Sequence, residues 1–201
     1  MAGMAGSPEE PRGIVAANVE AASLEAASLE AARAGDLAAF EMLMRQYERL
    51  VLVTALRLLG NMPDAQDISQ EVFLKLYRNL RKVDGAQGIA GWLYRVTVNA
   101  CRDLQRRKRP ESPVEFTEDL PAGGMDPQQA ATESERRRAL AMSLRMLPEK
   151  ERAALVLRDL EGLTTGEVAR ALGSSEATVR SQISKARVKV RGFVERYFRS
   201  R

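Results

Sequence analysis

A stretch of acidic residues, prolines and glycines interrupts the chain past its midpoint and limits how the rest can fold. Residues 110–135 contain seven acidic side chains and no lysine or arginine, and Gly123 and Gly124 are consecutive. Such a segment offers little apolar surface to bury and several residues that break helices, which predicts a linker. The 201-residue chain is therefore expected to fold as two small bodies on either side of this linker. We call residues 35–109 the first body and residues 136–201 the second body, and expect residues 1–34 to be a partly disordered, Ala-rich extension with a possible helix.

Apolar residues recur at helical spacing in the first body. Asp36 is placed to cap a helix, and a break at residues 60–63 separates this helix from one beginning at Asp64. Apolar residues at spacings of three and four predict a buried face for each helix. The predicted buried positions are Phe40, Leu43, Met44, Tyr47, Leu50, Val51 and Thr54 in the first helix, Ile68, Val72, Leu76 and Leu80 in the second, and Trp92, Val96, Ala100 and Leu104 in a third.

The second body ends in a pattern typical of a helix-turn-helix. A first helix is expected from Arg136, and Thr164 with Glu167 fits a capping box that opens a short later helix. Gly173 follows that helix, where a left-handed residue is needed, and Ser174 or Ser175 can cap the last helix. These signals predict an all-α fold of two small helical domains.

The phase of the last helix separates an apolar face from a polar one. Val179, Ile183, Ala186 and Val190 recur on one narrow face, which must point inward. The opposite side combines small residues with long hydrogen-bond donors that can reach base edges in a major groove. These candidate base-reading residues are Arg180, Ser181, Ser184 and Lys185. Candidate phosphate-binding residues around them are Arg170, Ser174, Ser175, Arg187 and Arg191, with free backbone N–H groups expected near the two serines.

Charge and composition favour a polyanionic partner and argue against an enzyme. The second body has a net charge of +9, and residues 99–109 add +4. The chain has no histidine and one cysteine, Cys101, so we expect no metal site, no cofactor and no catalytic residue. No apolar run is long enough to cross a membrane, which predicts a cytoplasmic protein without membrane insertion.

Four stretches together resemble the extracytoplasmic-function (ECF) sigma factors of bacterial RNA polymerase. They are residues 67–80 (DISQEVFLKLYRNL), residues 91–109 (GWLYRVTVNACRDLQRRKR), residues 147–187, and the acidic linker that takes the place of the family's connector. The resemblance covers roughly residues 35–194. It implies a non-catalytic subunit that binds core polymerase and directs promoter recognition and melting. The first body then corresponds to sigma region 2, and the second to sigma region 4.

The resemblance also implies roles for particular residues. It places Asp67, Gln70, Glu71 and Lys75 against the clamp helices of the largest polymerase subunit. Residues 82–90 would capture a flipped minus-ten base, although this loop has no aromatic side chain, and Asn99, Arg102, Arg106 and Arg107 would contact the melted strand. The second body would read the minus-thirty-five element and bind the flap of the second-largest subunit. An anti-sigma factor is a possible further partner.

Two rival functions remain open at this point. An autonomous activator or repressor could use the same helix-turn-helix, but it would need to dimerise to read two half-sites. A helical adaptor could present its basic faces to an acidic protein or RNA. Neither rival explains both the acidic helix face around Asp67 and the basic segment at residues 91–109.

Overall fold

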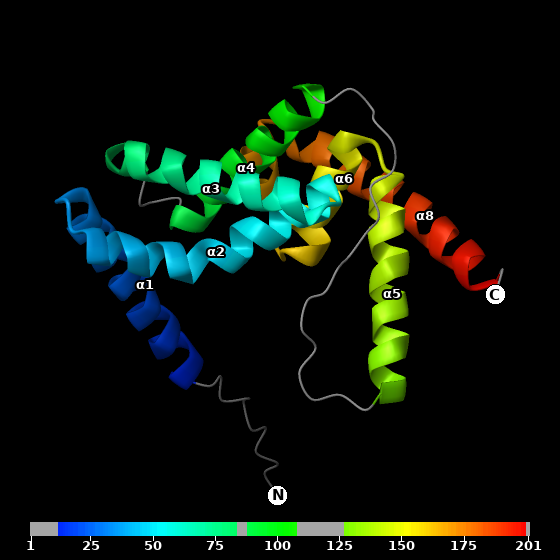
Figure 1. The fold of residues 1–201 in the computed structure, drawn as a ribbon, viewed down its shortest axis with the longest axis horizontal. Helices are drawn as coiled ribbons and strands as arrows, with labels where there is room; N and C mark the ends of the chain where they lie inside the picture. The colour runs from blue at the N-terminus through cyan, green and yellow to red at the C-terminus, as the bar shows by residue number, and fades with distance from the viewer. Residues whose placement is uncertain (1–11, 84–87, 108–126, 200–201) are drawn as a thin grey trace, which may run out of the picture. The chain divides into compact units, whose positions relative to one another are not determined.

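The computed structural model describes residues 12–83, 88–107 and 127–199, and every element in these segments is a helix (Figure 1). The helices are α1 (Arg12–Arg33), α2 (Leu37–Leu59), α3 (Met62–Asn79), the 3-10 turn η1 (Leu80–Lys82), α4 (Gly88–Arg107), α5 (Pro127–Arg145), α6 (Glu149–Leu155), the π-helical turn η3 (Val156–Leu160), α7 (Thr165–Leu172) and α8 (Glu176–Arg199). The all-α prediction is confirmed. The middle of the predicted base-capture loop, residues 84–87, and residues 108–126, which include most of the predicted linker, lie outside the described segments.

Residues 1–46 and residues 47–201 form two compact units. In the first unit, the Ala-rich stretch of the extension is helical as α1. Gly35 has φ +99° in the turn that follows, a conformation that glycine adopts without strain. The carboxylate of Asp36 accepts from the N–H groups of Ala38 (2.9 Å) and Ala39 (3.2 Å), which confirms it as the cap of α2.

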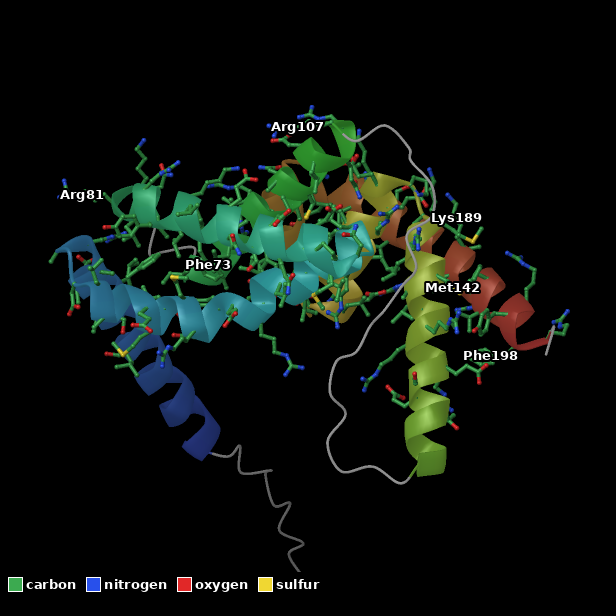
Figure 2. The ribbon with its side chains drawn as sticks, in the orientation of Figure 1. Phe73, Arg81, Arg107, Met142, Lys189 and Phe198 are labelled. Atoms are coloured by element: carbon green, nitrogen blue, oxygen red, sulfur yellow. The ribbon has the colours of Figure 1, made fainter. Side chains whose placement is uncertain are left out.

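The second unit contains helices from both predicted bodies. α3 packs against α4, and α8 packs against α5, α6 and α7. α4 also packs against α7, so the two bodies meet directly. Side chains of α3 such as Phe73 are buried, whereas Arg81 and Arg107 point away from the ribbon (Figure 2).

The buried face of α4 differs from the prediction. Ala100 is buried as expected, but Trp92, Val96 and Leu104 are half-exposed. The buried positions of the helix are Ile89, Leu93, Tyr94, Thr97, Val98, Ala100 and Cys101. The reason is that α4 is covered by α3 on one side and by α7 on another, so its buried face is wider and rotated relative to that of a helix with one partner.

Two helices begin earlier than their sequence patterns indicated. α5 starts at Pro127 rather than Arg136, so residues 127–135 of the predicted linker are helical. α3 starts at Met62, because Asn61 caps it by accepting from the Asp64 N–H (2.9 Å) and Pro63 fits the first turn. Proline at a helix start needs no hydrogen-bond donor, which is why both helices tolerate it.

The helix-turn-helix has the predicted end signals. Thr164 and Glu167 form a reciprocal capping box, with the Thr164 N–H donating to the Glu167 carboxylate at 2.7 Å. Gly173 is left-handed at φ +59° and ends α7. Ser175 caps α8, and its hydroxyl accepts from the Thr178 N–H at 3.2 Å. The local sequence therefore determines the turn, and the turn determines the direction of α8.

Candidate nucleic-acid interface

The outward side of α8 carries the predicted base-reading residues. Val179 and Ala186 are completely buried, which fixes the rotation of the helix about its axis. Arg180, Ser181, Ser184 and Lys185 are all exposed on the other side, as the helical phase predicted. An open groove of about 420 Å³ runs beside them and is lined by Arg158, Thr165, Arg180, Ser184, Arg187 and Arg191, among others. Small and basic side chains thus share one accessible surface.

Several of the basic side chains of α8 are held by carboxylates. Arg187 makes two hydrogen bonds to Asp159 (2.8 and 2.6 Å), and these bonds raise the pKa of the guanidinium. Arg180 donates to Glu176 at 3.0 Å. Arg191 is exposed and lines the groove. The carboxylates position the guanidinium groups before any anion binds.

At the turn before α8, one backbone N–H that was expected to be available to a phosphate already has a partner in the protein. The N–H of Ser174 donates to the Ala169 carbonyl at 2.9 Å, because the left-handed Gly173 folds the chain back over the end of α7. The N–H of Ser174 itself is therefore not free, whereas the expectation of free N–H groups near the two serines stays a prediction. The Ser175 hydroxyl is exposed but interacts with Thr178. Arg170, on α7, is exposed.

A second basic stripe runs along α4. Asn99, Arg106 and Arg107 are exposed, and Arg102 is half-buried. Arg106 pairs with Asp103 one turn before it. Arg95 lies four residues before Asn99 and is exposed on the same stripe. The sequence interpretation missed Arg95, although the spacing 95, 99, 102, 106 was a signal that could have revealed it.

The exposed face of α3 combines charge with apolar surface. Asp67, Gln70 and Glu71 are exposed, and Lys75 pairs with Glu71 at 2.6 Å. Leu74 and Tyr77 lie among them and are 55% and 51% exposed. The sequence interpretation gave no role to Leu74. Leu74 and Tyr77 are neighbours at i, i+3 and form one apolar patch surrounded by charged side chains, an arrangement that marks protein contacts.

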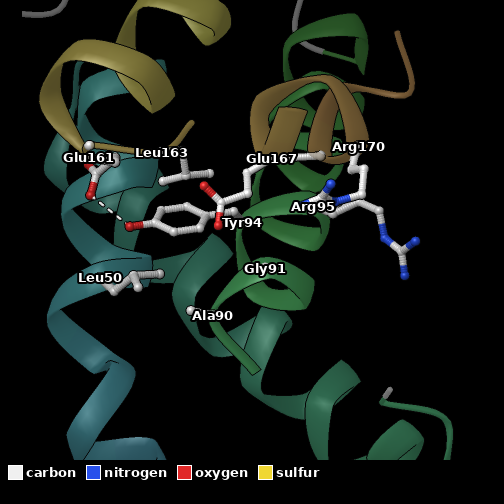
Figure 3. A pocket seen from close by; sticks show the side chains of 11 residues that line it. Leu50, Ala90, Gly91, Tyr94, Arg95, Glu161, Leu163, Glu167 and Arg170 are labelled. Carbon is white, nitrogen blue, oxygen red and sulfur yellow. Dashed lines mark hydrogen bonds between the residues drawn. The ribbon is translucent and has the colours of Figure 1, made fainter. Parts of the chain in front are cut away.

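Polar contacts join the first body to the second body around Glu161. The Glu161 side chain is 10% exposed and accepts from Arg57 of α2 (2.7 Å) and from the Tyr94 hydroxyl of α4 (3.1 Å). Burial raises the pKa of Tyr94, and the neighbouring Glu161 carboxylate raises it further. An open cavity of about 440 Å³ adjoins this contact, and the side chains of Arg95 and Arg170 lie beside each other at its edge (Figure 3).

Two more contacts join the first body to the second body, at the other end of α4; we call all of these contacts together the junction. Arg102 Nε lies 2.9 Å from Glu149 Oε1 without a hydrogen bond at that nitrogen, so the contact is an ion pair. The Arg152 guanidinium donates to the carbonyl oxygens of Leu58 (2.6 Å), Arg145 (3.2 Å) and Leu147 (3.0 Å). Burial lowers the pKa of Arg152. Candidate nucleic-acid-binding residues of both bodies, Arg102 and Arg170, therefore lie at this junction.

The residues that the structure describes include no cluster of three or more histidine, cysteine or acidic side chains arranged to hold a metal ion. Cys101 is buried, and burial raises the pKa of its thiol to about 12, with smaller effects from Glu71 and Asp64. Within these residues, no helix combines the length and apolar character that a membrane span needs.

Comparisons with known proteins match both bodies. The family model for Sigma-70 region 2 matches residues 43–111, and the model for Sigma-70 region 4 matches residues 137–190. The ECF RNA polymerase sigma factor SigE of Mycolicibacterium smegmatis is 36% identical over 81% of this chain, which spans 65% of that protein's length. The RNA polymerase sigma-H factor of Pseudomonas aeruginosa is 32% identical over 76% of this chain and 84% of its own length.

Solved structures share the fold. CnrH, solved in complex with the cytosolic domain of CnrY, is 25% identical, with a TM-score of 0.64 over 86% of this chain and 97% of its own. The sigma factor RpoE of Bartonella quintana, solved with the anti-sigma factor NepR, has a TM-score of 0.63 at 18% identity over 78% of this chain and 96% of its own.

Proposed function

We propose that α8 reads the minus-thirty-five promoter element and that α4 binds the melted minus-ten strand, because the chain belongs to the ECF family of RNA polymerase sigma factors. Members of this family are non-catalytic factors that act in transcription initiation. The observation that carries this proposal is the division of α8 into two sides. Val179 and Ala186 are fully buried, whereas Arg180 and Ser184 line an accessible basic groove. A helix held in this way can enter a major groove and present donors to base edges.

On α4, the stripe of Arg95, Asn99, Arg102 and Arg106 supports the proposed strand contact. Basic side chains along one helix face, here interrupted by the polar Asn99, can follow the phosphates of a single strand. Arg107 extends the same positive charge at the end of the helix. The identity of any captured minus-ten base depends on residues 82–90, of which residues 84–87 lie outside the described segments.

The face of α3 is our proposed contact with the clamp helices of the largest polymerase subunit. Asp67, Gln70, Glu71 and Lys75 supply charge and hydrogen bonds, and exposed Leu74 supplies apolar area at their centre. Opposite charges mainly accelerate association, while buried apolar side chains provide much of the affinity. Leu74 and its exposed neighbour Tyr77 are therefore the residues that we expect to anchor this contact.

The flap contact and anti-sigma regulation stay proposals. Met142 is exposed on α5, Met146 directly after the end of α5, and Phe198 on α8, and these two helices pack together. Their apolar side chains provide surface for the flap of the second-largest subunit. RpoE of Bartonella quintana was solved with an anti-sigma factor, and we propose a partner of that class for this chain. We also propose that the protein is located in the cytoplasm, where it would bind the polymerase.

Run-off transcription with core polymerase tests the proposed function. On a promoter from the protein's own operon, adding the chain should produce a new start site. The outcome that contradicts the proposal is no new start site together with a palindromic footprint made by the chain alone, which would support the autonomous activator or repressor. Binding to RNA or an acidic protein, without any promoter effect, would support the adaptor.

The variant Arg180→Ala tests the assignment of the base-reading helix. It should weaken promoter recognition by about 1–3 kcal/mol in a base-dependent manner. Arg196→Ala is the matched control, because Arg196 is exposed on the same helix but does not line the groove. Equal loss on all promoter sequences would instead assign Arg180 to a phosphate.

A further inference from the structure

Glu176 is an acidic residue at the start of an otherwise basic DNA-facing stripe. It is the first residue of α8, and its side chain is 53% exposed. Residues 177–191 contain five basic side chains and no acid. Positions 176, 180 and 184 follow one another at four-residue spacing, so Glu176 continues the stripe of Arg180 and Ser184 toward the helix N-terminus.

The surrounding structure gives the Glu176 carboxylate a defined position. One of its oxygens, Oε2, accepts from Arg180 Nη1 at 3.0 Å. The other, Oε1, would lie 3.4 Å from a β-carbon placed on Gly166 of α7. This distance is an ordinary van der Waals contact, so the carboxylate lies directly against α7 at position 166. The carboxylate is thus set between α7 and the guanidinium of Arg180.

A carboxylate on this surface weakens the binding of DNA in general but can recognise one particular base. The carboxylate repels the phosphates that the neighbouring arginine and lysine side chains attract, and this repulsion lowers the affinity for DNA of any sequence. In a major groove, however, glutamate accepts a hydrogen bond from the N4 amino group of cytosine, while arginine donates to guanine. The first residues of a recognition helix are those that contact base edges in the helix-turn-helix.

We propose that Glu176 is a specificity-determining residue, which accepts from the N4 amino group of a cytosine while it holds Arg180 against the neighbouring base pair. This inference rests on the proposed function of α8 as the promoter-reading helix. A negative charge at the start of a helix also stabilises the helix dipole. The test must therefore separate base reading from helix stability.

The experiment compares three variants as holoenzymes on a promoter library in which each minus-thirty-five base pair is replaced in turn, together with an unrelated duplex. Glu176→Gln removes the charge. Glu176→Asp keeps the charge at the helix start but shortens the reach to the base. Glu195→Gln is the matched control, because Glu195 is exposed near the other end of the same helix.

Reading by Glu176 predicts different effects on promoter DNA and on the unrelated duplex. In Glu176→Gln, preference for cytosine at one position should fall about tenfold, while affinity for the unrelated duplex stays equal or rises. Glu176→Asp should lose the same preference, and Glu195→Gln should keep it. The inference is overturned if Glu176→Gln changes affinity for all sequences by one factor, or if Glu176→Asp retains the full cytosine preference.

Arg180→Ala in the same assay separates this inference from the proposed function. If Arg180→Ala alters base preference and Glu176→Gln does not, only the role of Glu176 is wrong. If neither variant alters any base preference, the assignment of α8 as the reading helix is wrong as well.

Discussion

Two buried threonines carry hydroxyl groups that make no hydrogen bond. Thr54 of α2 and Thr97 of α4 are completely buried, and each Oγ1 lacks a partner. A buried hydroxyl without a partner costs about 1–3 kcal/mol relative to a hydrogen-bonded one. The core of the second unit therefore contains residues that are not optimal for its stability.

Replacing Thr97 by valine should increase the free energy of unfolding by about 1 kcal/mol, since the methyl group fills the same space without the desolvation cost. Urea denaturation followed by circular dichroism measures this change. Ser143→Ala is the control, because Ser143 is equally buried but donates to the Leu140 carbonyl at 2.7 Å. It should lower the free energy of unfolding or leave it unchanged. A loss of stability in Thr97→Val would contradict the interpretation.

At the residue scale, periodicity predicted which side chains of α8 are exposed but not what they contact. Arg180, Ser181, Ser184 and Lys185 are exposed as predicted, because a helix of known phase fixes the direction of each side chain. The pairing of Arg187 with Asp159 joins residues 28 positions apart. Such a pairing depends on how the helices pack, and no local pattern contains it.

At the scale of elements, the turn between α7 and α8 determines the direction of the reading helix. Gly173 has φ +59°, and a β-carbon placed on it would meet no atom within 4 Å. The requirement for glycine is therefore conformational rather than steric. Gly91, within α4, also has open space around it but does not have a positive φ.

The two glycines should respond to alanine with opposite signs. Gly173→Ala should lower the free energy of unfolding by about 1 kcal/mol, because alanine is strained in the left-handed conformation. Gly91→Ala should raise it by about 0.5–1 kcal/mol, because alanine favours the helix interior. Thermal or urea unfolding of both variants measures this difference. Equal effects of the two substitutions would contradict the conformational account.

Caps and breaks were the element features that the sequence predicted best. A helix start or end depends on the residues next to it, so the residue types alone predict it. Examples are Asp36, the pair of Thr164 and Glu167, and Gly173. The buried face of α4 was predicted in the wrong phase, because it depends on contacts with both α3 and α7. α5 begins nine positions before Arg136, at Pro127, because Gln, Ala and Glu after that proline favour a helix despite the acidic character of the segment.

At the scale of the whole molecule, the contact between the first and second bodies was not predictable from either body alone. It joins Arg57, Tyr94 and Arg102 to Glu149 and Glu161, which lie far away in sequence. Ion pairs in a partly buried contact add little net stability, because removing charges from water opposes their attraction. The ion pairs of this contact can therefore be lost at modest cost.

The Arg102–Glu149 pair and the proposed strand contact compete for one guanidinium. Arg102 is 23% exposed and Glu149 is 42% exposed. A pair of this exposure contributes up to about 1 kcal/mol. Binding of a single strand by Arg102 must overcome that contribution.

Glu149→Gln should therefore strengthen binding of the free chain to a single-stranded oligonucleotide by up to about fivefold, which corresponds to the energy of the pair. Fluorescence anisotropy at fixed low salt measures the affinity. Glu151→Gln is the matched control, because Glu151 pairs with Lys189 within the second body, at 2.8 Å. To separate release of Arg102 from simple loss of negative charge, the same comparison is made in an Arg102→Ala background. The gain from Glu149→Gln should disappear there. A gain of equal size without Arg102, or an equal gain in Glu151→Gln, would show that net charge rather than the junction controls strand binding.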